Sequence, residues 1–181
     1  RQLFLSNTKD LAAALSEEGY YDVPADSYAN ALQRAQFLKH VIEDQDLYRI
    51  FWDDGNLLPR RESDVQLIFK LTWFRSAFDV NAEVNNGRGP VDFKASIGSM
   101  DKSLIEFKIA SNKKLKQNLQ NQLPVYEAAN ETKKSVKVIV FFTAQEGDRL
   151  YSILEELDML EAENIVAIDA RNDNKPSGSK A

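Results

Sequence analysis

Two short stretches of alternating apolar and polar residues constrain the fold of this chain more than any other feature. Residues 91–96 and residues 104–109 each place apolar side chains at every second position. This period of two is typical of a β-strand, because successive side chains of a strand point to opposite faces. The intervening residues 97–103 contain glycine, serine and aspartate, which favour turns. We therefore predict that the two strands pair as an antiparallel hairpin.

The polar face of this hairpin carries two carboxylates and a lysine. Asp92 lies on the polar face of the first strand, and Glu106 and Lys108 lie on that of the second. Side chains two apart on one face are roughly 6.5 to 7 Å apart, and strand pairing should bring Asp92 beside Glu106. Magnesium binds one or two carboxylates together with waters and phosphate oxygens, and it promotes phosphodiester hydrolysis. An ordinary surface salt bridge is the alternative, and the spacing alone favours it.

Two further motifs make a family resemblance visible. Residues 89–92 (Gly-Pro-Val-Asp) and 106–108 (Glu-Phe-Lys) resemble the Asp and Glu-x-Lys elements of the PD-(D/E)xK superfamily, the restriction-endonuclease-like nucleases, although a valine separates Pro from Asp. Gln122 and Tyr126 resemble the Gln-x-x-x-Tyr element that follows Glu-x-Lys in nucleases similar to the exonuclease domain of recombination helicase complexes. The motif histidine of those relatives has no counterpart here, because the only histidine, His40, lies well upstream.

This resemblance implies a metal-dependent nuclease that hydrolyses phosphodiester bonds in nucleic acid, with DNA as the expected substrate and a restriction, phage-defence or repair setting. Mg²⁺ is the expected cofactor, and Mn²⁺ is a substitute. Asp92 and Glu106 would bind the metal and Lys108 would serve the attacking water, with Gln122 and Tyr126 as helpers. The alternative is a catalytically silent nuclease-like module for nucleic-acid binding or assembly. A small-molecule phosphohydrolase is a third class, which would need a closed pocket.

The remaining patterns predict an α/β fold, namely a restriction-endonuclease-like mixed β-sheet flanked by helices, with a helical N-terminal elaboration. We divide the chain into a helical subdomain (1–56), a nuclease core (57–172) and a polar tail (173–181). An apolar run such as 136–142 is typical of a strand covered on both faces, so we place it at the centre of the sheet. The crossover to the last strand should be parallel and right-handed. The expected helices and outer strands are 59–74, 78–84, 112–130, 146–160 and 165–168.

The predicted helix 59–74 carries Glu62 in its first turn. A carboxylate there interacts favourably with the helix dipole. The resemblance adds a second interpretation, because other branches of the superfamily use a helical acid as a metal ligand. Both interpretations of Glu62 stay open at this point.

Any nucleic-acid surface must be local, because the net charge of −5 argues against a broadly basic one. The candidate contacts are Arg88 and the cluster Lys113, Lys114 and Lys116 at the start of helix 112–130. A solvated helix face is the alternative for that cluster. The same helix places Leu115, Leu119, Gln122 and Tyr126 on one stripe, and Pro124 should kink it.

Composition limits the remaining possibilities. The chain has no cysteine and one histidine, so a metal should be hard and bound by oxygen. At 181 residues and 43% hydrophobic, it can bury one good core. No stretch is apolar enough to cross a membrane, and we expect a cytoplasmic protein without a membrane partner. Arg1 suggests a piece of a longer protein, and a homo-oligomer or a domain of a larger complex is compatible with the sequence.

Overall fold

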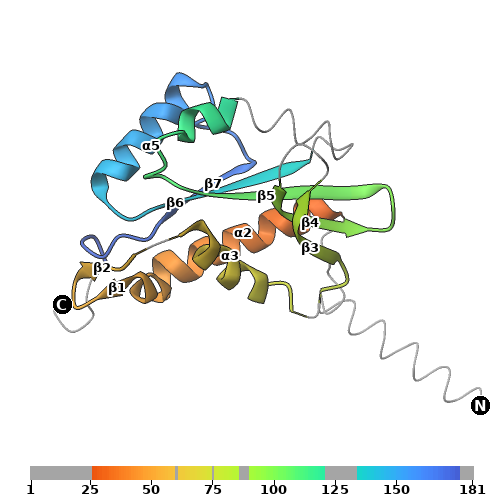
Figure 1. The fold of residues 1–181 in the computed structure, drawn as a ribbon, viewed down its shortest axis with the longest axis horizontal. Helices are drawn as coiled ribbons and strands as arrows, with labels where there is room; N and C mark the ends of the chain where they lie inside the picture. The colour runs from red at the N-terminus through yellow and green to blue at the C-terminus, as the bar shows by residue number, and fades with distance from the viewer. Residues whose placement is uncertain (1–25, 60, 75, 86–89, 121–133, 176–181) are drawn as a thin grey trace, which may run out of the picture.

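The computed structural model describes residues 26–59, 61–74, 76–85, 90–120 and 134–175. It has a mixed α/β fold in which helices lie on both sides of one five-stranded sheet (Figure 1). The order of the strands in the sheet is β3-β4-β5-β6-β7, so β5 is central. This arrangement confirms the α/β class predicted from the sequence. None of the helices in the described ranges is long and apolar enough to cross a membrane.

The first three strands of the sheet form an antiparallel meander. They are β3 (Asp79–Asn85), β4 (Pro90–Ile97) and β5 (Asp101–Ile109), with Ala82 opposite Phe93 and Phe93 opposite Ile105. The predicted hairpin is confirmed, and its turn contains Gly98 at a φ of 65°, which a glycine adopts without strain.

The last two strands are parallel to β5. β6 (Ser135–Phe141) pairs with β5, and β7 (Ile165–Asp169) pairs with β6. Every residue of β6 is buried, as its apolar sequence predicted. Its central placement was wrong, however, because β6 lies one strand in from the β7 edge. Burial on both faces shows that a strand is covered, but it does not show which interior position the strand takes.

Helix α2 (Ser27–Asp44) and helix α3 (Glu62–Leu71) cover one face of the sheet (Figure 1). Asp26 caps α2 by accepting a hydrogen bond from the N–H of Ala29 at 2.8 Å. The apolar side of α2 belongs to the same core cluster as Phe93, Phe107 and Val138 of the sheet. The predicted boundary at residue 56 therefore does not separate two hydrophobic cores. The described part of segment 1–56 continues through η1 (Leu47–Phe51), β1 (Trp52–Asp53) and β2 (Asn56–Leu57).

Helix α5 (Ala144–Glu156) covers the other face of the sheet. The hydroxyl of Thr143 caps it by accepting from the N–H of Glu146 at 3.2 Å. Leu150, Ile153 and Leu154 form a second apolar cluster with the outer side of β6. This helix starts two residues earlier and ends four residues earlier than predicted.

The other predicted helices also need corrected boundaries. Arg61 is the N-cap of α3, and the backbone N–H of Arg61 donates to the Asp64 carboxylate, so the expected first residue, Pro59, lies outside the helix. The predicted helix 112–130 begins only at residue 115 and is helical through residue 120, where this described range ends.

Candidate active site

The hairpin and the start of α3 bring four predicted site residues together. Asp92 comes from β4, Glu106 and Lys108 come from β5, and Glu62 is the first residue of α3. The backbone pairing of β4 with β5 ends at Phe93 and Ile105. Beyond that point the Asp92 side chain spans the two strands, because its Oδ2 accepts a hydrogen bond from the N–H of Phe107 at 2.6 Å.

Lys108 lies between two of the carboxylates. Its Nζ is 2.8 Å from Oε1 of Glu106 and 3.7 Å from Oε2 of Glu62. It also donates to the carbonyl of Phe107 at 3.0 Å. The Lys108 and Glu106 side chains are only 14% and 13% exposed, so this pair is not the solvated surface salt bridge that the spacing alone favoured.

Glu62 joins the helix to the end of the central strand. Its Oε1 accepts from the N–H of Ile109 at 3.3 Å and from Nδ2 of Asn112 at 3.5 Å. Its other oxygen, Oε2, is the one near Lys108. Glu62 therefore does more than interact with the dipole of α3, because it holds the end of β5 and faces the lysine of the site.

The site is partly buried, and it contains more carboxylates than cations. Burial raises the pKa of Asp92 to about 6, and the nearby negative charges of Glu106 and Glu62 add to the rise. The N–H of Phe107 and the ammonium of Lys108 oppose it. Burial also disfavours the ammonium, but Glu106, Glu62 and Asp92 outweigh that effect and raise the pKa of Lys108 above its ordinary value.

This donor set suits a hard cation held by few protein ligands. Three carboxylates face one ammonium, so the fully ionised cluster carries a net charge of about −2, which a divalent ion would neutralise. Within the described ranges, no group of three or more acidic or histidine side chains is arranged to hold a metal ion. Magnesium does not require one, because it keeps several waters and binds one or two carboxylates. Asp92 and Glu106 fit that role.

Several predicted residues cannot be placed in this site. Gln122, Tyr126 and Arg88 lie outside the described residues. Lys113 and Lys114 are exposed in the turn that follows β5. Lys116 is exposed as well, and its ammonium pairs with Glu156 of α5.

Sequence reasoning missed the residue that fixes this turn. The guanidinium of Arg149, on α5, donates to the carbonyls of Ala110 at 2.6 Å and Asn112 at 3.0 Å, and it approaches that of Lys113 at 3.4 Å. It thereby holds the chain where it leaves the site. Nothing in the local sequence of Arg149 signals this role, because its partners are carbonyl groups more than 35 residues away.

Together the fold and the site define a mixed α/β protein with an acidic, lysine-containing cluster at the end of its central hairpin. The chain belongs to a family described as a domain of unknown function, DUF8371, which matches residues 27–144. All four clustered residues lie inside the matched region. Neither a curated protein nor a solved structure matches the chain.

Proposed function

We propose that this protein is a metal-dependent nuclease that hydrolyses phosphodiester bonds, with DNA as the expected substrate. The observation that carries the proposal is the convergence of Asp92, Glu106 and Lys108 from two paired strands into one partly buried cluster. The resemblance of these residues to the PD-(D/E)xK elements supports the same conclusion. Mg²⁺ is the proposed cofactor, and Mn²⁺ is the proposed substitute.

Each residue has a chemical task in this proposal. Asp92 and Glu106 would hold the cation, which supplies positive charge at the scissile phosphate and acidifies a water. Lys108 would orient the attacking water and stabilise the negative charge that develops on the phosphate oxygens. The water adds across one P–O bond, leaving a phosphomonoester on one side and a hydroxyl group on the other.

Substrate would approach along the turn that follows β5. Lys113 and Lys114 are exposed there, next to the end of the strand that carries Glu106 and Lys108. Lysines in such a place can contact phosphates without specifying a base sequence. Because the net charge of the chain is −5, we propose contacts that are few and local.

The test is cleavage of plasmid and single-stranded DNA by the purified protein in Mg²⁺ and in Mn²⁺. The variants Asp92→Asn, Glu106→Gln and Lys108→Met should each lower the cleavage rate by about 10²-fold or more. Asp148→Asn is the matched control, because Asp148 is an exposed acid on α5, outside the cluster. It should cleave as the parent protein does.

Two outcomes would count against the proposal. Equal cleavage by the parent protein and the three cluster variants would show that the nuclease activity does not come from this site. Binding of DNA without cleavage in either metal would indicate instead the catalytically silent binding or assembly module. Circular dichroism of each variant separates loss of activity from loss of the fold.

A further inference from the structure

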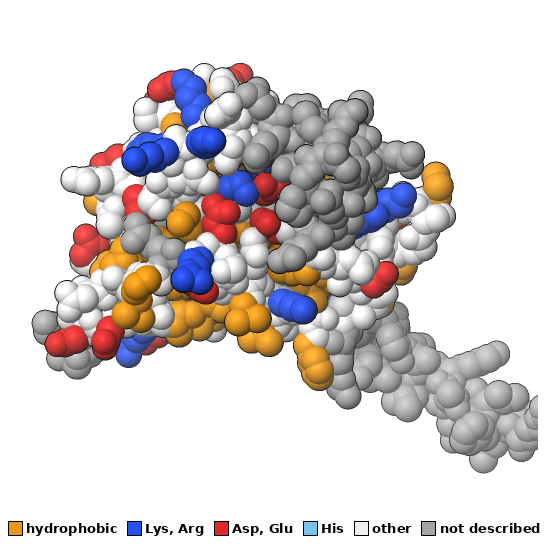
Figure 2. All heavy atoms as spheres, viewed as in Figure 1, with side chains coloured by type: hydrophobic (Ala, Val, Ile, Leu, Met, Phe, Trp, Pro, Cys, Tyr) orange, Lys and Arg blue, Asp and Glu red, His pale blue; other side chains and the backbone are white. Residues whose placement is uncertain are grey.

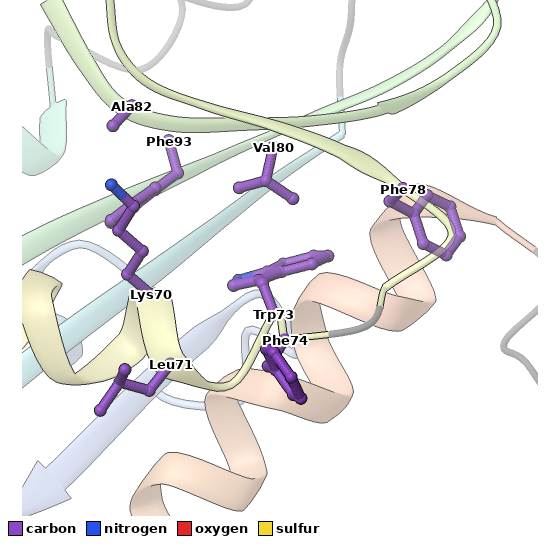
Figure 3. A pocket seen from close by; sticks show the side chains of 8 residues that line it. All are labelled: Lys70, Leu71, Trp73, Phe74, Phe78, Val80, Ala82 and Phe93. Atoms are coloured by element: carbon purple, nitrogen blue, oxygen red, sulfur yellow. The ribbon is translucent and has the colours of Figure 1, made fainter.

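The other end of α3 borders a second hollow, which the proposed nuclease chemistry does not use. Its volume is about 370 Å³, and Figure 3 shows that its walls come from the end of α3, the turn after it and strands β3 and β4. That volume lies at the small end of the range for ligand sites, about 300–1,000 Å³. The lining side chains are largely apolar: Lys70, Leu71, Trp73, Phe74, Phe78, Val80, Ala82 and Phe93.

Trp73, which lines this hollow, has a buried indole N–H. The residue is 7% exposed, and its Nε1 has no hydrogen-bond partner in the described structure. A buried N–H without an acceptor costs about 1–3 kcal/mol, so buried donors are nearly always paired. The indole is held in place, because the Arg34 guanidinium lies 4.5 Å from the ring centroid and Phe69 makes an edge contact at 5.9 Å.

The charge of the hollow also favours an acceptor. Among the described lining residues, Lys70 carries the only formal charge. Figure 3 shows its side chain extending from α3 toward Ala82 of β3, with the Trp73 indole below Val80. An apolar body that carries a carboxylate would complement both the apolar walls and the Lys70 ammonium.

An edge strand of the described sheet lies beside the hollow and distinguishes a peptide from a small acid. β3 is an edge strand that pairs only with β4 in the described sheet. Val80 and Ala82 of this strand line the hollow. An extended peptide can pair with such an edge and place a side chain in an adjacent pocket.

Exposed apolar side chains on the rim point to a partner larger than one small molecule. Leu71 is 74% exposed and Phe74 is 82% exposed. Hydrophobic side chains gather along this margin of the molecule, over α3 (Figure 2). Apolar side chains grouped in this way around a pocket are typical of an interaction site.

We propose that this hollow binds the carboxyl-terminal residue of a peptide. The apolar side chain of that residue fills the hollow, its carboxylate pairs with the Lys70 ammonium, and the preceding residues pair with β3. The proposal does not depend on the nuclease activity, because no residue of the hollow belongs to the acidic cluster.

Tryptophan fluorescence gives a direct test. The chain has two tryptophans, Trp52 and Trp73, so a Trp52→Phe protein reports from Trp73 alone. The probes are the peptide acetyl-Val-Thr-Val-Phe with a free carboxylate, the same peptide as its amide, and N-acetylphenylalanine. We expect the carboxylate peptide to bind about tenfold more tightly than either of the other two. Because Trp52 donates to the carbonyl of Ala170 at 2.9 Å, thermal unfolding of this variant must first show that it is folded.

Variants of the lining residues locate the binding. Lys70→Gln should remove the preference for the carboxylate over the amide, and Ala82→Glu should reduce binding of the carboxylate peptide by at least about tenfold. Lys94→Gln is the matched control, since Lys94 neighbours Phe93 on β4 but points to the opposite face of the sheet. It should leave binding unchanged.

Three results would overturn the proposal. Equal affinity for the acid and amide peptides would show that the site does not recognise the carboxylate. Equal affinity for N-acetylphenylalanine and the carboxylate peptide would show that pairing with β3 does not contribute to binding. The absence of saturable binding by the carboxylate peptide up to about 5 mM would show that the hollow is not a peptide-binding site. None of these results bears on the nuclease proposal, whose test uses DNA cleavage.

Discussion

The two ends of α3 border sites that differ in what they lack. At the first residue of the helix, Glu62 faces Lys108, and this cluster contains more carboxylates than cations. In the turn after the last residue, Trp73 has a buried N–H without an acceptor among the described residues, and Lys70 lines the same hollow. A ten-residue helix is only about 15 Å long. One short helix therefore borders both a site with an excess of negative charge and a site where a described N–H lacks a hydrogen-bond acceptor.

The strand beside α3 shows the same contrast over a single residue. Asp92 enters the acidic cluster, and its neighbour Phe93 enters the core and the hollow. Successive side chains of a strand point to opposite faces, so β4 can supply both sites at once. The difference indicates the partner of each site: a cation for the cluster, and an anionic acceptor with an apolar body for the hollow.

The largest effect should come from Lys108→Met, which removes the ammonium group that faces the carboxylates of the cluster. The Glu106 and Glu62 carboxylates would lose their partner in a partly buried place, so the free energy of unfolding at pH 7 should fall by about 3 kcal/mol. Urea unfolding measures this change. Lys116→Met is the control, because Lys116 and Glu156 are 47% and 54% exposed and such a pair contributes about 0–1 kcal/mol. Equal losses in the two variants would mean that the cluster behaves as surface charge.

Asp92→Asn should act in the opposite direction on stability. Burial raises the pKa of Asp92 from 3.8 to about 6, so the folded state holds this proton more tightly than the unfolded state. Ionisation therefore costs folding free energy as the pH rises through the range from about 4 to about 6, up to about 3 kcal/mol at pH 7. Asparagine keeps an oxygen that can accept from the N–H of Phe107. The variant should be more stable than the parent at pH 7, and this advantage should disappear near pH 4.

Urea unfolding of both proteins across that pH range measures the effect. Asp79→Asn is the control, since Asp79 is an exposed acid on β3, outside the cluster, and its replacement should change the free energy of unfolding by no more than about 0.5 kcal/mol. If the Asp92→Asn variant is destabilised to the same degree at pH 4 and pH 7, Asp92 affects stability through its packing and hydrogen bonding rather than through its charge.

Added Mg²⁺ should stabilise the folded protein by a smaller amount. At a free concentration ten times the Kd, one bound ion raises the free energy of unfolding by about 1.4 kcal/mol. Thermal unfolding with and without Mg²⁺ measures this, and Asp92→Asn should lose the stabilisation. Ala82→Glu, at the hollow, should keep it. An equal response to Mg²⁺ in both variants would indicate that the ion binds elsewhere.

The sequence predicted the acidic cluster better than it predicted the surroundings of the cluster. Alternation with a period of two and a short turn determine which side chains share a face, so Asp92, Glu106 and Lys108 could be grouped in advance. The partners of Glu62 could not be predicted, because Ile109 lies 47 residues away from it and helical spacing does not reveal which strand a helix will cover.

The hollow could not have been found from the sequence at all. An indole N–H needs an acceptor, and whether one packs nearby depends on the whole tertiary arrangement rather than on the residues around Trp73. The pattern of 59–74 predicted a helix that continues to Phe74, but the structure ends α3 at Leu71. The turn that follows turns Trp73 inward, where it is 7% exposed, and leaves Phe74 outside.

The smallest effect should come from Phe74→Ser, which tests whether the two ends of α3 are independent. Phe74 is 82% exposed, so its loss should change the free energy of unfolding by no more than about 0.5 kcal/mol. The variant should bind the carboxylate peptide more weakly and respond to Mg²⁺ as the parent protein does. Fluorescence titration and thermal unfolding of one preparation measure both properties. A change in the Mg²⁺ response would show that α3 transmits changes at one end to the other, and that the two sites act as one.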